Sequence, residues 1–425
     1  MAEYINLSWQ GTPNGATRAE RQSCGYRAYV PDPLLGRPLI LKGQRAADVN
    51  DVERRLMELN TSERPLVSLE ALARLLLRAE AVASSFIEGL QINVRRLAKA
   101  DVAERTGIEM RDDTAHAVLG NVRAMESALG LADAPAIHLD DVLELHRRLL
   151  NGTRDARFGG LIRTEQNWVG GTGMSPCTAD FVPPPPDRVH SLLEDLCAYI
   201  SGDEHPALVQ AAIAHAQFET IHPFVDGNGR TGRALIHLIL RRRGLAPRFV
   251  PPISLILASH ADAYISALTS YRYEGAADSP EAQESMGVCI DRFTVDTARA
   301  IVDTDRFGAD LDALETDWRR KLGSVRSGSS VDLLLRVLPS APVLTVATAA
   351  DLIGRSSQRA NDAVNQMAAV GILRQTTIGR RNRAFEAPDL INALTGFERA
   401  LANPLGDTRQ APPARPAPTG LRGEG

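Results

Sequence analysis

The segment HPFVDGNGRTGR, residues 222–233, brings a histidine, a carboxylate, glycines and two arginines together within one short stretch. Apolar residues recur at helical spacing before it, over 207–221, and after it, over 230–243. The segment is therefore predicted to be a turn between two helices. Its glycines allow backbone amides to approach an anion at the N-terminus of the second helix.

Gly227, Gly229 and Gly232 also satisfy the G-x-G-x-x-G pattern of dinucleotide-binding proteins. That interpretation fails because a helix precedes the glycines where a buried strand is required, and no strand–helix repeat follows. A P-loop is excluded because no Gly-Lys-Ser/Thr is present. His215 and His222 lack the H-E-x-x-H spacing of a zinc hydrolase. We therefore interpret the turn as a phosphate-binding site.

The side chains of the segment suit attack on a nucleotide phosphate. His222 has an ordinary pKa near neutrality and can accept a proton from a hydroxyl. Asp226 is a natural ligand for magnesium, which prefers one or two carboxylates together with substrate phosphates. Arg230 and Arg233 lie in the first helical turn, where the helix dipole disfavours positive charge unless an anion is bound. These parts match the needs of phosphoryl or nucleotidyl chemistry.

The segment resembles, at every fixed position, the H-P-F-x-D/E-G-N-G-R-x-x-R motif of the Fic family, whose members mostly transfer AMP from ATP to a protein hydroxyl. The sequences NWVGG and ADFVPPPP are similar to the flap of that family, and the arm around 29–40 is similar to its N-terminal extension. The resemblance covers roughly 26–322. It implies the all-α Fic fold with a small β-hairpin flap.

Carried onto this chain, the resemblance implies His222 as the general base and Asp226 as a ligand of Mg²⁺ between the α and β phosphates. Phe224 is expected to be a buried anchor for the loop. The remaining motif positions would bind the phosphates of ATP, and these are Gly227, Asn228, Gly229, Arg230 and Arg233.

A second motif lies at the end of a predicted helix over 67–89. Ser84, Glu88 and Gly89 are similar to the inhibitory pattern Ser/Thr-x-x-x-Glu-Gly/Asn of self-restrained family members. Glu88 would form a bidentate pair with Arg233 and so misalign ATP for in-line attack. The alternative is a solvated glutamate near a helix end. In some relatives this glutamate aligns a water that removes AMP, so de-AMPylation, like transfer of another nucleotide, stays an alternative function.

Residues 167–186 are predicted to form an exposed hairpin, the flap. Four apolar residues flank its Gly/Ser/Pro-rich turn, and these are Trp168, Val169, Phe181 and Val182. An extended target segment could pair with a free strand edge of this hairpin and present its hydroxyl to His222. A structural loop that packs the aromatic residues explains the same composition.

The rest of the chain is predicted to be mainly helical. Residues 1–65 are interpreted as an irregular arm with one helix at 46–59, and 66–322 as the Fic domain. Residues 331–400 are expected to form a winged-helix-like domain, and the Pro/Gly/Ala-rich tail 403–425 to be disordered. Further helices are expected at 113–129, 140–150, 187–201, 260–273 and 288–322.

The winged-helix prediction depends on three helices, at 331–338, 345–353 and 356–370, followed by strands at 372–375 and 383–386. Basic residues at the start of the third helix and in the wing suit contacts to DNA phosphates. They are Arg355, Arg359, Arg380, Arg381 and Arg383. Protein docking or pairing with a second copy of the chain is the alternative use of such a module.

Composition limits the class of protein. The chain has 425 residues, 44% hydrophobic and 24% charged, with a formal charge of −4. No membrane-length apolar run or secretory signal is present, so we expect a cytoplasmic location and no membrane contact. Four widely spaced cysteines are expected to be free thiols: Cys24, Cys177, Cys197 and Cys289.

The sequence thus predicts a protein adenylyltransferase that uses Mg-ATP, modifies a Ser, Thr or Tyr hydroxyl of a target protein or of itself, and is autoinhibited by Glu88. A hypothesis from another class is a nucleotide-sensing, DNA-binding regulator. The intact His222 argues against a pure sensor, because binding phosphates requires no base at that position.

Overall fold

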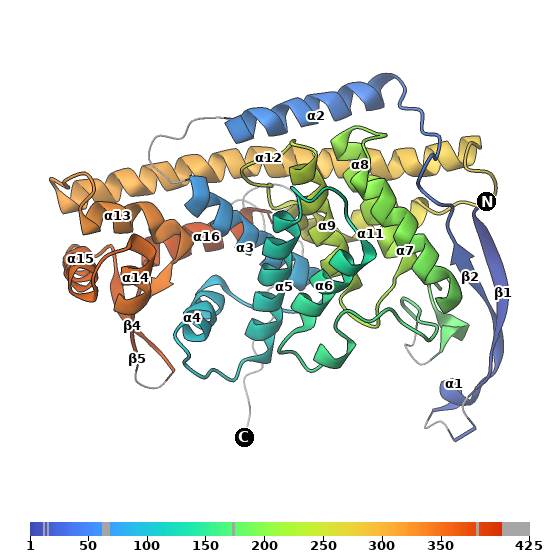
Figure 1. Ribbon diagram of the computed structural model, residues 1–425, viewed down its shortest axis with the longest axis horizontal. Helices are drawn as coiled ribbons and strands as arrows, with labels where there is room; N and C mark the ends of the chain where they lie inside the picture. The colour runs from blue at the N-terminus through green and yellow to red at the C-terminus, as the bar shows by residue number, and fades with distance from the viewer. Residues whose placement is uncertain (12, 15–16, 62–68, 172–174, 380–381, 402–425) are drawn as a thin grey trace. The chain divides into compact units, whose positions relative to one another are not determined.

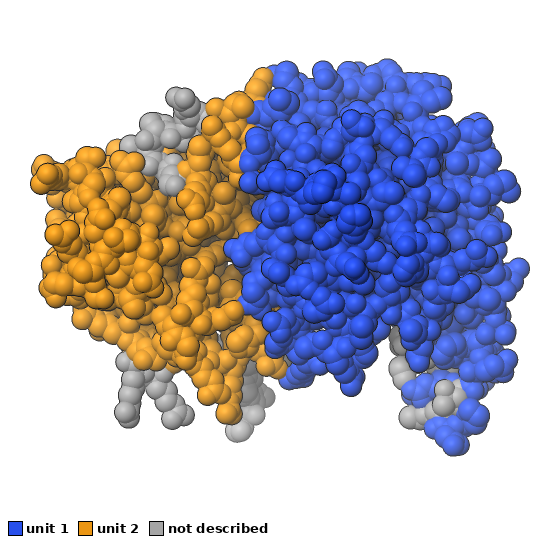
Figure 2. Space-filling view, viewed as in Figure 1, with its two compact units in different colours: residues 1–57, 120–247, 262–295 blue, residues 58–119, 248–261, 296–425 orange. Residues whose placement is uncertain are grey.

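A computed structural model describes residues 1–11, 13–14, 17–61, 69–171, 175–379 and 382–401. The predicted tail 403–425 and the wing residues Arg380 and Arg381 lie outside these ranges. The described chain is mainly helical. It divides into two compact units, residues 1–57, 120–247 and 262–295 in the first, and 58–119, 248–261 and 296–425 in the second (Figure 2).

Helices occupy most of both units. Those of the N-terminal and middle parts are α1 (Arg18–Arg21), α2 (Gly43–Thr61), α3 (Leu69–Ile87), α4 (Val94–Arg105), α5 (Asp113–Gly130), α6 (Leu139–Leu150), α7 (Pro186–Ser201), α8 (Ala207–Ile221) and α9 (Asn228–Arg242). Those that follow are α10 (Ile253–Ser259), α11 (Ala261–Ser270), α12 (Pro280–Leu322), α13 (Ser330–Val337), α14 (Val346–Ile353), α15 (Ser357–Ala369) and α16 (Pro388–Leu401). The sequence missed α1, α4, α10 and α16.

The central helix of the first unit is α8, which is packed against α7 and α9 (Figure 1). All but one of its residues are buried, as expected for a helix that is apolar all round. Its two buried glutamines donate to backbone carbonyls: Gln210 donates to Tyr199 at 2.7 Å, and Gln217 donates to Asp32 at 2.8 Å. The C-terminus of α8 is therefore held firmly where the motif begins.

The first residues form an ordered ribbon, so the prediction of an irregular arm was wrong there. Strands β1 (Glu3–Trp9) and β2 (Cys24–Val30) pair antiparallel along their whole length, from Glu3 with Val30 to Trp9 with Cys24. The residues of the ribbon are mainly half-buried or exposed, so neither strand shows the clean alternation of apolar and polar residues that identifies strands in sequence.

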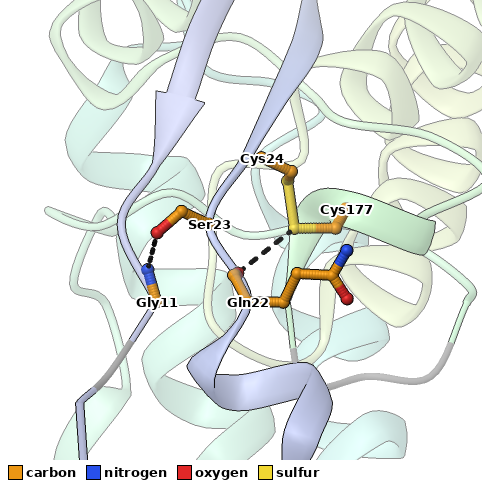
Figure 3. Close-up of a disulfide and its surroundings, with 5 residues drawn as sticks. All are labelled: Gly11, Gln22, Ser23, Cys24 and Cys177. Carbon is orange, nitrogen blue, oxygen red and sulfur yellow. Dashed lines mark hydrogen bonds between the residues drawn. A yellow bond between two sulfur atoms is a disulfide. The ribbon is translucent and has the colours of Figure 1, made fainter.

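A disulfide joins Cys24 at the start of β2 to Cys177 in the predicted flap (Figure 3). The prediction of free thiols was therefore wrong for this pair, while Cys197 and Cys289 are free and buried. The bonded cysteines are 153 residues apart in sequence, a pairing that spacing alone does not reveal.

Residues 167–186 are described apart from 172–174. They contain one antiparallel bridge, between Val169 and Phe181, and a short 3₁₀ turn, Pro176–Thr178. The amide of Val169 donates to the Phe181 carbonyl at 2.8 Å. The amide of Tyr29 in β2 donates to the Val182 carbonyl at 2.9 Å, so the segment is tied to the ribbon as well as to itself.

In the second unit, α3 packs against α10. The carboxylate of Glu80 is buried and accepts a hydrogen bond from the Ser254 amide at 2.8 Å and another from the Ser254 hydroxyl. The rings of Phe307 in α12 and Phe397 in α16 stack at 4.2 Å. The C-terminal helix is thereby part of the core of this unit.

Helices α13, α14 and α15 lie where the sequence predicts three helices, and they contact one another. A three-stranded antiparallel sheet of order β3-β5-β4 accompanies them, with β3 (Val343–Leu344), β4 (Arg374–Ile378) and β5 (Asn382–Glu386). Ser356 caps α15 through the Arg359 amide. Among the described residues, none of the helices combines the length and the apolar character needed to cross a bilayer.

Candidate active site

His222 ends helix α8 in a left-handed backbone conformation, with φ 49° and ψ 61°. Among the described residues it is the only one besides glycine with a positive φ. Such a conformation costs a non-glycine residue of order 1 kcal/mol and persists only where its surroundings impose it. Its Nδ1 contacts the Glu219 carbonyl at 3.4 Å. A proton on Nδ1 leaves Nε2 as the acceptor in the neutral ring, which is the form that a general base needs.

The loop after His222 is fixed by its own side chains. Asn228 makes two hydrogen bonds to the backbone of Phe224, accepting from its amide and donating to its carbonyl, both at 2.8 Å. The ring of Phe224 is fully buried, which confirms its role as an anchor. The side chain of Asn228 is thus engaged in shaping the loop, and its position in the first turn of α9 leaves its backbone amide as the group that can face a phosphate.

His146 in α6 supports the loop from the other side, a role that sequence reasoning missed. Its Nδ1 accepts from the Gly160 amide at 3.0 Å, so its Nε2 donates to the Asp226 carbonyl at 2.9 Å. The ring stacks on Phe224 at 3.7 Å. Burial lowers the pKa of His146 to about 4, so the ring is neutral near pH 7. It is 80 residues from Asp226 in sequence, so no local pattern could reveal the contact.

Gly227 combines a left-handed backbone conformation with close contact to α6. It has φ 78° and is the N-cap of α9. An added Cβ would lie 2.9 Å from Cδ2 of Leu149 and 3.4 Å from Nε2 of His146. The position therefore requires glycine both for its backbone conformation and for the close approach of α6.

The N-terminus of α9 carries the positive charge of the site. No side chain of the described residues caps it, so its first amides keep their donor capacity. The Arg230 side chain is almost fully buried and donates from Nη2 to Oδ2 of Asp226 at 2.8 Å, while its Nε is buried and has no hydrogen-bond partner within the part of the chain that the structure describes. Arg233 is 1% exposed. Two buried guanidinium groups at a helix N-terminus oppose the helix dipole, an arrangement that a bound anion would stabilise.

The carboxylate of Asp226 fits a magnesium ion carried by phosphates. Its side chain is 46% exposed, and its Oδ2 accepts a hydrogen bond from Arg230. In the described part of the chain, no cluster of three or more His, Cys, Asp or Glu residues could bind a metal by itself. A single accessible carboxylate beside an anion site is what Mg²⁺ uses when most of its ligands are phosphate oxygens and water.

Two regions of the chain match known protein families. Residues 136–240 match the Fic/DOC family, and residues 46–130 match the Fic/DOC family N-terminal region. The first match contains the whole motif loop with His222, Asp226 and Arg230. The chain thus contains a Fic/DOC domain, preceded by the N-terminal region of that family.

The relatives of this Fic/DOC chain include curated enzymes. It is 38% identical over 133 residues to protein adenylyltransferase fic-1 of Caenorhabditis briggsae, which is 31% of this chain and 23% of that protein. It is 40% identical over 119 residues to protein adenylyltransferase Fic of Drosophila mojavensis, 27% of this chain and 22% of that protein. The matched part thus spans about a quarter of these curated relatives. A crystal structure of a Fic family protein from Desulfovibrio desulfuricans aligns over 82% of this chain and 98% of that one, with 22% identity and TM-score 0.47.

The flap residues of this Fic/DOC site are divided between exposed and buried positions. Val169 is 40% exposed, whereas Phe181 and Val182 are each 6% exposed. Trp168 packs edge-on against Trp9 of β1 at 5.5 Å, and the Arg272 guanidinium lies 3.4 Å from the centre of the Phe181 ring. Trp168 and Phe181 therefore pack against the rest of the unit, as expected if the flap is a structural loop. Of the four predicted flap residues, Val169 has the exposed side chain.

The predicted inhibitory residues lie in the second unit, at the C-terminal end of α3. Ser84 is fully buried, and Glu88 is exposed in the turn that follows the helix. Gly89 has φ 84°, and the amides of Glu88 and Leu90 both donate to the Ser85 carbonyl, at 3.1 and 3.0 Å. A left-handed glycine with such hydrogen bonds is a common helix end.

Gly232 allows α8 and α9 to lie close together. An added Cβ would lie 2.7 Å from Oε1 of Glu219 and 2.9 Å from Cδ1 of Phe218. We expect Gly232→Ala to lower the free energy of unfolding by about 1–3 kcal/mol through overpacking. Urea unfolding measures this, with Gly130→Ala as the control, because Gly130 ends α5 with open space around its Cα. Equal stability of the two variants would contradict the close contact.

His215 provides a pH-dependent contribution to stability. Burial, assisted by the Arg233 guanidinium, lowers its pKa to about 3, and its Nε2 is 2.8 Å from the Tyr264 hydroxyl. Because the pKa is higher in the unfolded chain, unfolding takes up a proton below about pH 6.5, and the contribution of the neutral ring is lost as pH falls towards 3. Relative to His215→Gln, the wild type should lose about 2–3 kcal/mol of unfolding free energy between pH 7 and 4.5. A pH-independent difference in urea unfolding would contradict this.

Proposed function

We propose that this Fic/DOC chain is a protein adenylyltransferase that transfers AMP from ATP to a hydroxyl of a target protein. The observation that carries the proposal is the half-buried imidazole of His222 beside an uncapped helix N-terminus with two buried arginines. The names of the curated relatives support the same reaction class. Because the chain matches only part of those relatives, the activity of the whole protein is our proposal.

In the proposed reaction, Nε2 of His222 takes the proton of a Ser, Thr or Tyr hydroxyl. The hydroxyl oxygen forms a bond to the α-phosphorus of ATP, and the bond from that phosphorus to the bridging oxygen of the β-phosphate breaks. Pyrophosphate leaves with the electron pair. Backbone amides around Gly227, Asn228 and Gly229 would bind the α-phosphate, and Arg230 and Arg233 the β and γ phosphates.

Asp226 would hold a magnesium ion on the nucleotide, which neutralises phosphate charge when it is bound. In the structure the carboxylate of Asp226 pairs with Arg230. When the nucleotide binds, the cation would replace Arg230 as the partner of Asp226, and phosphate oxygens would replace Asp226 as the partner of Arg230. The resting ion pair keeps the buried guanidinium partly compensated until the substrate arrives.

We further propose that Glu88 restrains the enzyme by pairing with Arg233, as the inhibitory motif implies. Docking of the target is proposed to use the flap backbone near Val169, with Trp168, Phe181 and Val182 as its packed support. An extended target segment would then be recognised mainly through main-chain hydrogen bonds.

Mass spectrometry of purified Glu88→Gly protein incubated with Mg-ATP tests the function. We expect an added adenylyl group on a Ser, Thr or Tyr hydroxyl of the protein itself. Label placed on the α-phosphate of ATP should be retained, and label on the γ-phosphate should be lost with pyrophosphate. Retention of the γ-label on the protein would instead indicate a kinase. If neither label becomes bound to the protein, transfer is contradicted.

DNA and a second copy of the chain are further partners that we propose for the winged-helix-like module. Three arginines of this module are exposed: Arg355 just before α15, Arg359 in α15 and Arg383 in β5. Filter binding of a DNA duplex at two salt concentrations tests the first partner, because phosphate contacts weaken steeply with salt. Absence of salt-sensitive binding would leave pairing with protein as the use of the module.

A cytoplasmic location stays a prediction from the sequence. The Cys24–Cys177 disulfide weighs against it, because structural disulfides persist mainly in oxidising compartments. Alkylation of thiols in intact cells before lysis decides the question for these two residues: full labelling of both would indicate a reducing compartment.

A further inference from the structure

Arg163 is a buried arginine that lies outside the motif. It is 3% exposed, and within the described ranges its guanidinium donates only to backbone carbonyls. Nε donates to His222 at 2.9 Å, Nη1 to Glu165 at 3.2 Å, and Nη2 to Ile221 at 3.4 Å and to Pro184. Its own amide donates to the Pro223 carbonyl at 2.9 Å. Through its side chain and its own amide, Arg163 therefore joins the end of α8, the catalytic loop and the end of the flap.

Burial of the positively charged Arg163 side chain is unfavourable in free energy, because the guanidinium loses its hydration. Among the described residues, no carboxylate forms an ion pair with Arg163. Burial lowers its pKa to about 10. A buried charge without a counter-ion is retained only where dipoles replace water around it. The last carbonyls of α8 supply those dipoles, because a helix C-terminus carries unsatisfied carbonyls and partial negative charge.

Asn167 acts on the same backbone. Its Nδ2 donates to the His222 carbonyl at 3.3 Å and to the Phe224 carbonyl at 3.1 Å. The His222 carbonyl thus accepts from both Arg163 and Asn167. Since His222 has the left-handed conformation that an L-residue rarely adopts, two donors on its carbonyl oppose rotation of the peptide plane back to an ordinary helical or extended geometry.

We propose that Arg163, assisted by Asn167, is a positioning residue that fixes the backbone of His222 and ties it to the flap. The imidazole and the backbone that docks the target would then keep one relative geometry through the bond to Pro184. Arg163 touches neither ATP nor the reacting atoms, and it acts through His222. This inference rests on the proposed adenylyltransferase function.

The test compares variants of the full chain that carry Glu88→Gly. Arg163→Gln should lower kcat for AMP transfer about a hundredfold, because small misplacement of a reacting group has effects of that size. KM for ATP should change by less than about threefold, since the phosphate-binding groups are untouched. Arg163→Lys keeps the charge without the planar fork and should recover about a tenth of the lost rate. Should Arg163→Gln fail to fold, Asn167→Ala takes its place, with an expected loss of about tenfold.

Arg242→Gln is the matched control. Arg242 is half-buried rather than buried, but like Arg163 it donates to loop carbonyls, those of Ala132, Ala134 and Pro135, at the far end of α9. A merely structural role of Arg163 would make the two variants lose stability alike and leave kcat of the folded enzyme unchanged. That result would overturn the proposal.

Hydrogen exchange separates this inference from the proposed function. The amides that can exchange in the two tethered segments are those of residues 221, 222 and 224–226 and those of Phe181 and Val182, because the positions between and after them are prolines. They should exchange faster in Arg163→Gln than in Arg242→Gln. If the Glu88→Gly parent transfers no AMP, the proposed function is wrong. The positioning role of Arg163 is then tested by the hydrogen-exchange data alone. Unchanged exchange in both segments would then overturn its positioning role.

Discussion

Replacing His222 with alanine in a chain that also carries Glu88→Gly is expected to reduce AMP transfer by about 10²–10⁴-fold, the range that a positioned general base contributes. The reason is geometric as well as chemical. Few residues besides glycine adopt the left-handed conformation of His222, and the structure imposes it at the junction of the buried helix and the phosphate loop. Single-turnover assays with α-labelled ATP measure the loss.

Nucleotide binding by the His222→Ala variant should be nearly unchanged, because the amides of α9, Arg230 and Arg233 remain. Calorimetry with Mg-ATP checks this. His190→Ala is the matched control, since His190 is an exposed histidine on α7 that lies beside Glu194. A His222→Ala enzyme with the parent rate would remove the imidazole from the mechanism and leave only binding.

Replacing Glu88 with glycine is expected to raise AMP transfer about a hundredfold over the wild type, the effect of allowing the α-phosphate to align for in-line attack. Glu88→Gln should give a smaller rise, because the amide keeps the shape of the side chain but loses its charge-assisted pairing with an arginine. Labelled-ATP assays at equal protein concentration measure both.

Glu70→Gln provides the comparison on the same helix. Glu70 lies in the first turn of α3, where it pairs with Arg74 and is 74% exposed. Its replacement should leave transfer at the wild-type rate. Equal labelling by the wild type and by Glu88→Gly would refute the inhibitory role and favour the interpretation of Glu88 as a solvated residue.

Periodicity predicted the long helices because each carries an apolar stripe or is apolar throughout. Helix α8 was placed at its observed bounds, and α6 and α7 to within a residue. Helix α4 was missed because its apolar residues are mostly alanines and valines among charges, which gives a weak amphipathic signal. The β1–β2 ribbon was missed because two half-buried strands lack clean alternation.

The candidate site was predicted from the sequence as far as its residues are consecutive. The structure places His222, Asp226 and Arg230 around one loop, as the motif suggests. It also places Asn228 in the framework of that loop through its bonds to Phe224. The supports from elsewhere, His146 and Arg163, could not be found, because a lone histidine on an amphipathic helix and a lone arginine in a loop carry no pattern of their own.

The Cys24–Cys177 bond turns the first part of the molecule into a covalent ring. A single backbone cut anywhere between these two cysteines would leave both pieces attached, so the protein would migrate as one band on a denaturing gel until a reductant is added. Batches purified with and without dithiothreitol would then be chemically different molecules. Measurements of rate or melting temperature on this protein are comparable only between preparations with the same thiol history.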